Sequence, residues 1–260
     1  NLASGYVILP GANLAGSWDG LNTPHPAVVL NYVPAIGFKK VIDSYRYPAK
    51  VVVTGWHLCA LGDRKRRKPK NILFAPTHPP YNGVLSYYHK NQKVYRMLCD
   101  LLSGGLIDSL TVRHLGTAQE NGIDFTSRVE FHPRDVTKAA MSDFEDQLRD
   151  IDQADVVIGD GGTFATMAVA RGVTTLMYDS TLTCDPYTAK FPKNSTKYES
   201  YQRFPFDISD CWTDSLFTMM HQASIDFIKV AEWRRRFIGD PFAWKPEHLV
   251  KDLDLAAVYV

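Results

Sequence analysis

Short runs of apolar residues alternate with longer amphipathic stretches between residues 71 and 180 of the chain. Two of these runs, Ala154–Ile158 and Thr174–Tyr178, stand on either side of a stretch with helical character, Thr163–Ala170. Short apolar strands separated by helices are typical of a parallel sheet that is covered on both faces. The sequence therefore predicts an α/β fold built on a doubly wound parallel sheet.

The same pattern places the other elements of this region. Further strands are predicted over residues 72–75, 110–114 and 128–131, with helices over 91–102 and 141–151. A longer helix is predicted over 214–237, and a final one over 246–255. Residues 180–205 are predicted to form a long irregular loop, and loops of that length are usually functional.

The first 60 residues have the pattern of an incomplete α/β unit. Strands are predicted over 6–9 and 50–54, and a helix in the mixed stretch 27–45. About 55 residues are too few for an independent core of this type, so the segment is expected to lean on other parts of the protein. Because a strand follows the first residue, Asn1, so closely, we expect that residues upstream have been removed or are missing.

These elements predict four segments. They are a partial N-terminal α/β unit over residues 1–62, a linker over 63–70, the main α/β domain over 71–240, and a C-terminal helix over 241–260 that crosses back to the first unit. The linker assignment rests on the charged, proline-containing run Arg64–Lys70.

Composition narrows the class of protein. A 45% share of apolar residues suits an ordinary globular protein, and a net charge of +1 argues against a surface that is basic throughout. The basic runs Arg64–Lys70 and Arg234–Arg236 leave a local site for a polyanion open. The four cysteines show no metal-binding spacing, so we expect reduced thiols, no metal site and a cytoplasmic location. No apolar run approaches the roughly 18 residues of a membrane helix.

A glycine turn between a strand and a helix is the first candidate site. Gly161 and Gly162 leave backbone N–H groups accessible at a helix start, and Thr163 and Thr166 add hydroxyl groups. Such a helix start attracts phosphate, and ligands of open α/β sheets gather at this carboxyl edge of the strands. A tight structural turn that Thr163 caps would have the same residues, and neither GxGxxG nor GK[ST] is present.

Three histidines, His78, His114 and His132, each follow a predicted strand. Because parallel strands bring their carboxyl ends to one edge, we expect the three imidazoles to converge near the glycine turn. An imidazole can donate to phosphate or act as an acid or base near neutral pH, so the three are catalytic candidates. Any one of them alone is explained more simply as a hydrogen-bonded residue at the sheet rim. Arg134 and Asp179, at the same edge, could bind an anion and a sugar hydroxyl, or be a solvated arginine and a turn cap.

Several short motifs resemble those of one family group. The segments Val51–Gly55 (VVVTG) and Ile72–Thr77 (ILFAPT) resemble the interdomain crossover of CDP-glycerol glycerophosphotransferases and related GT-B glycosyltransferases. In that family, the next strand ends in His-Pro and contacts the donor phosphate. Here the matching strand ends in His114-Leu115, and the His-Pro pair stands one strand later, at His132-Pro133, so which histidine meets the phosphate stays open. The Asp160–Thr163 turn is similar to the Asp-Ser-Gly-Gly of UDP-N-acetylglucosamine 2-epimerases, which holds the UDP diphosphate.

The resemblance covers about residues 50 to 205 and implies two Rossmann-like domains. The second domain, here 71–240, would bind a UDP- or CDP-linked donor. Thr77, which ends the Ala-Pro-Thr motif, would join the glycine turn, Arg134 and Asp179 as a donor-binding residue. In such enzymes the acceptor and often the catalytic base come from the first domain, of which this chain holds only a part.

The function favoured by these features is a metal-independent transferase without a cofactor. It would move a glycosyl or glycerophosphate group from the nucleotide-activated donor to an acceptor, which could be a glycan, a polyol phosphate or a nucleic acid with modified bases. A nucleotide-sugar 2-epimerase is the rival enzyme, although it needs carboxylates from a complete first domain. A non-catalytic domain that only binds a nucleotide or a polyanion is the third interpretation.

Overall fold

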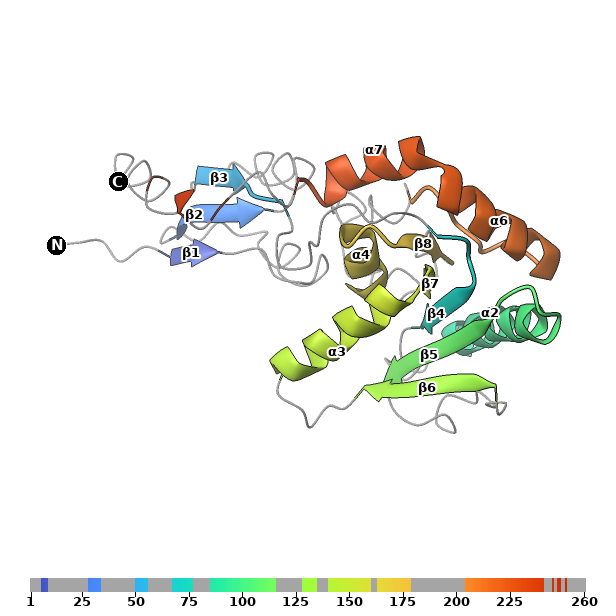
Figure 1. Ribbon diagram of the computed structural model, residues 1–260. Coiled ribbons are helices and arrows are strands. Elements are labelled where there is room, and N and C mark those ends of the chain that lie inside the picture. Colours follow the sequence, from blue (N-terminus) through green and yellow to red (C-terminus); the bar gives the residue numbers. More distant parts are fainter. Residues whose placement is uncertain are drawn as a thin grey trace.

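Two parallel sheets organise the computed structural model, a small one near the N-terminus and a larger one in the middle of the chain (Figure 1). The structure describes residues 6–8, 28–33, 50–55, 67–76, 85–115, 128–134, 140–159, 163–178 and 204–240, together with the single residues 245, 247, 248 and 251.

The larger sheet has five strands that all pair in parallel. They are β4 (Asn71–Ala75), β5 (Ser109–Leu115), β6 (Val129–Arg134), β7 (Val156–Gly159) and β8 (Thr174–Met177). Their order across the sheet is β6-β5-β4-β7-β8. The chain therefore adds strands on one side of β4 and then returns to add strands on its other side. The winding reverses between β4 and β7, and ligands of open α/β sheets bind outside the carboxyl ends of the strands at such a switch point.

Helices cover both faces of this sheet (Figure 1). Alternate residues of β4 point to opposite faces. Ile72 and Phe74 pack in a core with α2 (Leu85–Ser103) and α6 (Thr213–Ile225), whereas Leu73 packs in a second core with α3 (Ala140–Gln153) and α4 (Thr163–Ala170). β7 and β8 are buried along their whole length, as strands covered on both faces must be. The predicted doubly wound parallel sheet is confirmed.

The small sheet consists of three parallel strands in the order β1 (Tyr6–Ile8), β2 (Val28–Val33) and β3 (Lys50–Val53). The helix predicted within residues 27–45 is wrong over Val28–Val33, because this run, which is rich in valine and contains a tyrosine, pairs as a strand. The remainder of that stretch lies outside the described residues. Val51 and Val53 of β3 pack against the core between the larger sheet and the α3/α4 layer.

The single helix predicted over 214–237 is also wrong, because the structure has two helices there, α6 and α7 (Phe227–Phe237). Asp226 lies between them with a non-helical ψ of 90°. Its N–H donates to the Gln222 carbonyl at the end of α6, and its carboxylate accepts from the Lys229 N–H in the first turn of α7. The aspartate thus caps the second helix, a position in which its side chain competes with continuous helix formation.

A short segment extends the larger sheet beyond β8. The Met177 N–H donates to the Phe206 carbonyl at 2.9 Å, and the Ile208 N–H donates to the Met177 carbonyl at 2.7 Å. Residues 206–208 therefore lie parallel to the end of β8. The predicted loop over 180–205 and the predicted helix over 246–255 fall largely outside the described residues.

The remaining predicted elements agree with the structure to within a few residues, the main difference being that α2 starts at Leu85 instead of residue 91. The predicted boundaries near residues 62, 71 and 240 stay predictions. None of the described helices is long and apolar enough to cross a membrane.

Candidate functional site at the carboxyl edge of the larger sheet

The glycine turn starts at the switch point of the sheet. β7 ends at Gly159, which pairs in register with Ala75, the last residue of β4. A Cβ atom on Gly159 would lie 3.3 Å from the Ala75 carbonyl oxygen and 3.4 Å from the Ala165 Cβ of α4, so the glycine allows β4 and α4 to approach closely. α4 then begins at Thr163, and the N–H groups that no helix carbonyl accepts are brought to the switch point.

The structure describes some of the predicted site residues by their backbone only and others not at all. Thr163 and Thr166 lie in the first turn of α4, and His114 and Arg134 lie near the carboxyl ends of β5 and β6. The side chains of these four residues are outside the described part of the structure, as are the whole residues Thr77, His78, Gly161, Gly162 and Asp179. The carboxyl ends of β4, β5 and β7 share one edge, as predicted. The roles assigned to the nine residues stay predictions.

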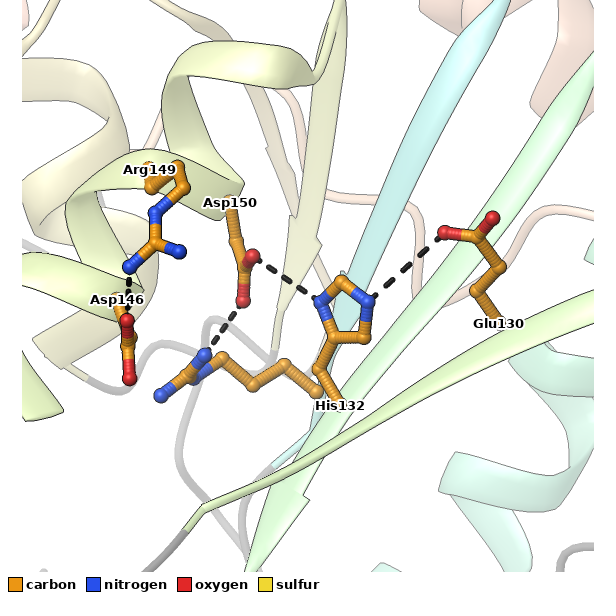
Figure 2. Close-up of polar contacts among 6 residues, drawn as sticks. Glu130, His132, Asp146, Arg149 and Asp150 are labelled. Carbon is orange, nitrogen blue, oxygen red and sulfur yellow. Dashed lines mark hydrogen bonds and ion pairs between the residues drawn. The ribbon is translucent and has the colours of Figure 1, made fainter. Parts of the chain in front are cut away.

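The imidazole of His132 is described, and two carboxylates lie beside it (Figure 2). Its Nδ1 is 3.1 Å from Oδ1 of Asp150 on α3, and its Nε2 is 3.8 Å from Oε2 of Glu130. His132 stands on the outer strand β6, with β5 and β4 between it and β7. At about 4.8 Å per strand, β6 and β7 are about 14 Å apart. The prediction that a histidine shares a pocket with Gly162 stays a prediction.

A buried ion pair lies behind His132. Arg113 NH1 is 2.5 Å from Asp150 Oδ2, and only 7% and 8% of these two side chains are exposed. Asp150 thus contacts both Arg113 and His132. Sequence reasoning missed this pair because Asp150 is one of several acidic residues of an amphipathic helix, and nothing in the sequence distinguishes it from the solvated ones. Arg113 carried a weak signal, since it is a charge within a buried central strand.

The Arg113–Asp150–His132 network shares a row and a face of the sheet with Gly159, the last residue of β7. His132 pairs in register with Arg113. The residue before Arg113, Val112, pairs with Phe74, the residue before Ala75, so His132, Arg113 and Ala75 lie in one row across the sheet. Ala75 and Gly159 lie two residues beyond Leu73 and Val157, which face the α3/α4 layer. Since Asp150 belongs to α3, the network and Gly159 lie on that same face.

Other buried groups near this edge support the fold. Tyr178 Oη donates to Asn91 Oδ1 of α2 at 2.6 Å, and the Tyr178 N–H donates to the Gly159 carbonyl at 3.0 Å. At the opposite, amino edge, Asp155 accepts from both the N–H and the side-chain amide of Asn71, at 2.8 and 2.9 Å. These bonds fasten α2 to β8 and β7 to β4.

Metal and thiol chemistry have no visible site in the described part of the chain. No cluster of three or more histidine, cysteine, aspartate or glutamate residues that could hold a metal ion occurs there. Burial raises the pKa of the Cys99 and Cys211 thiols, so both are protonated near neutral pH and are poor nucleophiles.

Comparisons with known proteins find similarity only at the level of structure. No family model matches the sequence, and neither does any curated protein. A variant of the wall teichoic acid polymerase TagF is 10% identical, with a TM-score of 0.49 over 93% of this chain and 59% of that one. A Listeria monocytogenes protein assigned as a UDP-N-acetylglucosamine 2-epimerase is 12% identical, with a TM-score of 0.49 over 91% of this chain and 63% of that one. The spinosyn rhamnosyltransferase SpnG is 13% identical, with a TM-score of 0.41 over 73% of this chain and 46% of that one.

The chain thus spans 46% to 63% of the length of these three proteins. A glycosyltransferase and an epimerase are among them, as the sequence motifs led us to expect. At such identities and TM-scores the similarity assigns no activity to the chain.

Proposed function

We propose that this chain takes part in transferring a glycosyl or glycerophosphate group from a nucleotide-activated donor, and that the turn after β7 holds the diphosphate of that donor. The observation that supports the proposal is the position of the strand before the turn: the strand order β6-β5-β4-β7-β8 brings the carboxyl end of β7 to the switch point. This is where open α/β sheets bind their ligands.

The chemistry of the turn suits a leaving diphosphate. Gly161 and Gly162 have no side chain to block an anion, and the N–H groups at the start of α4 carry partial positive charge. Donors fixed in advance around a developing anion lower the barrier to its departure. In this proposal Thr163 and Thr166 add hydroxyl donors, while Thr77, Arg134 and Asp179 contact the remainder of a UDP- or CDP-linked donor.

Nucleotide binding provides the first test. The full chain is screened by thermal shift against UDP, CDP, GDP and CMP, since a ligand at 100 times its dissociation constant stabilises a protein by about 2.7 kcal/mol. We expect UDP or CDP to raise the melting temperature, and CMP, which has a single phosphate, to do so less. No shift with any diphosphate would rule out the site, whereas binding without transfer or hydrolysis of a donor would favour a non-catalytic binding domain.

Replacing Gly162 by Val tests the turn directly. The branched side chain would occupy the space of the anion, so nucleotide affinity should fall at least tenfold, about 1.4 kcal/mol, with the melting temperature near that of the wild type. Ala231→Val, at an exposed position of α7, introduces the same branched side chain away from the switch point. Unchanged nucleotide binding by a folded Gly162→Val protein would leave the turn with a structural role only.

A further inference from the structure

His132 forms the outer end of a polar chain that starts in the protein interior (Figure 2). Asp150 uses one carboxylate oxygen for the buried guanidinium of Arg113 and the other for the Nδ1 of His132, 3.1 Å away. The His132 side chain is 39% exposed, in contrast to 8% for Asp150. The imidazole therefore links a buried ion pair to the solvent at the carboxyl end of β6.

We propose that Asp150 is the positioning residue of His132. It accepts a hydrogen bond from Nδ1–H, fixes the plane of the ring, and leaves Nε2 as the nitrogen that meets a ligand. This inference rests on the proposed function in one respect: the ligand is taken to be the nucleotide-activated donor or the acceptor that attacks it.

The chemistry of the two partners assigns the proton. A neutral imidazole has one nitrogen that donates and one that accepts, whereas an ionised carboxylate only accepts. With Asp150 at Nδ1, the proton of the neutral ring lies on Nδ1 and the lone pair on Nε2. Arg113 completes the arrangement, because a buried carboxylate requires a compensating charge and hydrogen bonds.

The surroundings of Nε2 differ from those of Nδ1. Oε2 of Glu130 is 3.8 Å from Nε2, beyond the length of a hydrogen bond, and the Glu130 side chain is 74% exposed. A ligand can displace such a group, whereas it cannot displace the buried Asp150. His132 also lies on the sheet face and in the residue row of Gly159, the residue after which the proposed diphosphate turn begins.

A merely structural network predicts something different. If the Arg113–Asp150 pair only fastens α3 to β5, nothing holds the half-exposed ring of His132 in a single tautomer. The first measurement is therefore which nitrogen of His132 carries the proton, and it requires no knowledge of the substrate. The kinetic comparison then distinguishes positioning for catalysis from a hydrogen bond that only supports the fold.

The test uses the full chain labelled with ¹⁵N-histidine. Long-range ¹H–¹⁵N correlation spectra report which nitrogen of each imidazole carries the proton. They are recorded over a pH series that extends until the rings are neutral. The His132 signals are assigned by their loss in His132→Gln. We expect protonation at Nδ1 in the wild type. A ring that is protonated mainly at Nε2, or that averages between the two tautomers as free imidazole does, would overturn the proposal.

Two aspartates of α3 provide a matched pair of variants (Figure 2). Asp150→Asn can donate as well as accept, so it should release the fixed tautomer of His132. Asp146→Asn, one turn earlier, alters an aspartate whose partner, Arg149, has a 62% exposed side chain, and should leave the His132 signals unchanged. If Asp150→Asn removes the charge that compensates Arg113 and the protein fails to fold, the double variant Arg113→Gln/Asp150→Asn, which removes both charges of the pair, takes its place with the same expectation. An unchanged His132 spectrum in the folded variant would contradict the proposal.

Transfer kinetics complete the test. With a donor chosen from the nucleotide screen, Asp150→Asn should lower kcat at least about tenfold with little change in the donor KM, while Asp146→Asn stays near wild type. A wild-type kcat in folded Asp150→Asn would overturn the positioning role. If no donor is turned over by the wild type, the proposed function fails, and the tautomer alone then decides the role of Asp150.

Discussion

Buried polar residues join the helices to particular strands, and each join depends on one or two hydrogen bonds. Tyr178 and Asn91 are 2% and 3% exposed, and the bond between their side chains is 2.6 Å long. When one partner of such a pair is removed, the other stays buried without its hydrogen bond, and its full desolvation penalty then destabilises the fold. Single substitutions at these positions are therefore expected to change the free energy of unfolding measurably, even where no ligand is involved.

Tyr178→Phe should lower the free energy of unfolding by about 1–2 kcal/mol, because the Asn91 carbonyl group loses a buried donor. Urea denaturation of Tyr178→Phe, Asn91→Ala and the double variant would measure the coupling between the two side chains, which we expect to be about 1 kcal/mol. Strictly additive effects would mean that the bond contributes nothing of its own.

The candidate site shows what residue patterns can and cannot predict. That His132 lies at the end of a strand follows from its position after an apolar run. Its partner does not follow, since Asp150 is 18 residues away from His132 and 37 from Arg113, and the three meet only through the packing of α3 against the sheet. The apolar pattern of the helix does not single out Asp150 among its acidic residues as the one that reaches Arg113 and His132.

At the level of helices and strands, periodicity predicted the elements that are buried on both faces. β4, β5, β7 and α4 lie where their apolar runs indicate, because burial and strand pairing favour the same residues. The two failures have local causes. Val28–Val33 was obscured by the mixed sequence around it, and the break between α6 and α7 depends on how one aspartate side chain bonds to the backbone.

Asp226→Ala should destabilise the protein by about 1 kcal/mol, because the Lys229 N–H in the first turn of α7 loses its acceptor. Asp226→Asn retains a side-chain oxygen at the same place and should stay within a few tenths of a kcal/mol of the wild type. Thermal denaturation of both variants makes the comparison. Equal stability of the alanine and asparagine variants would show that the side-chain oxygen is not the cap.

For the molecule as a whole, the contact between the two sheets is the feature with the widest effect. Val51 and Val53 of the small sheet pack against a core that also contains Trp233 and Phe237 of α7. The two sheets are thus joined by shared apolar surface as well as by the chain between them. Shared burial of this kind makes unfolding cooperative.

Val53→Ala should lower the free energy of unfolding by about 1 kcal/mol. The whole chain should still unfold in one transition, with its urea midpoint shifted to a lower concentration. Val52→Ala, whose side chain points to the other face of β3, is the matched control and should not weaken this contact. Tryptophan fluorescence and far-UV circular dichroism should give coincident urea curves. Separate transitions, of which Val53→Ala shifts only one, would show that the sheets unfold independently.

Residues 206–208, which pair with Met177, have a consequence for how copies of this protein meet each other. The last strand of an open sheet presents backbone N–H and C=O groups that can pair with a strand of another molecule, and such pairing begins aggregation. At the end of β8, Phe206 and Ile208 already occupy the N–H and carbonyl groups of Met177. An incoming strand from a second copy would have to displace this segment before it could pair with the end of β8 at Met177. On the opposite outer strand, β6, the exposed charge of Glu130 opposes the same event by raising the cost of a dry interface.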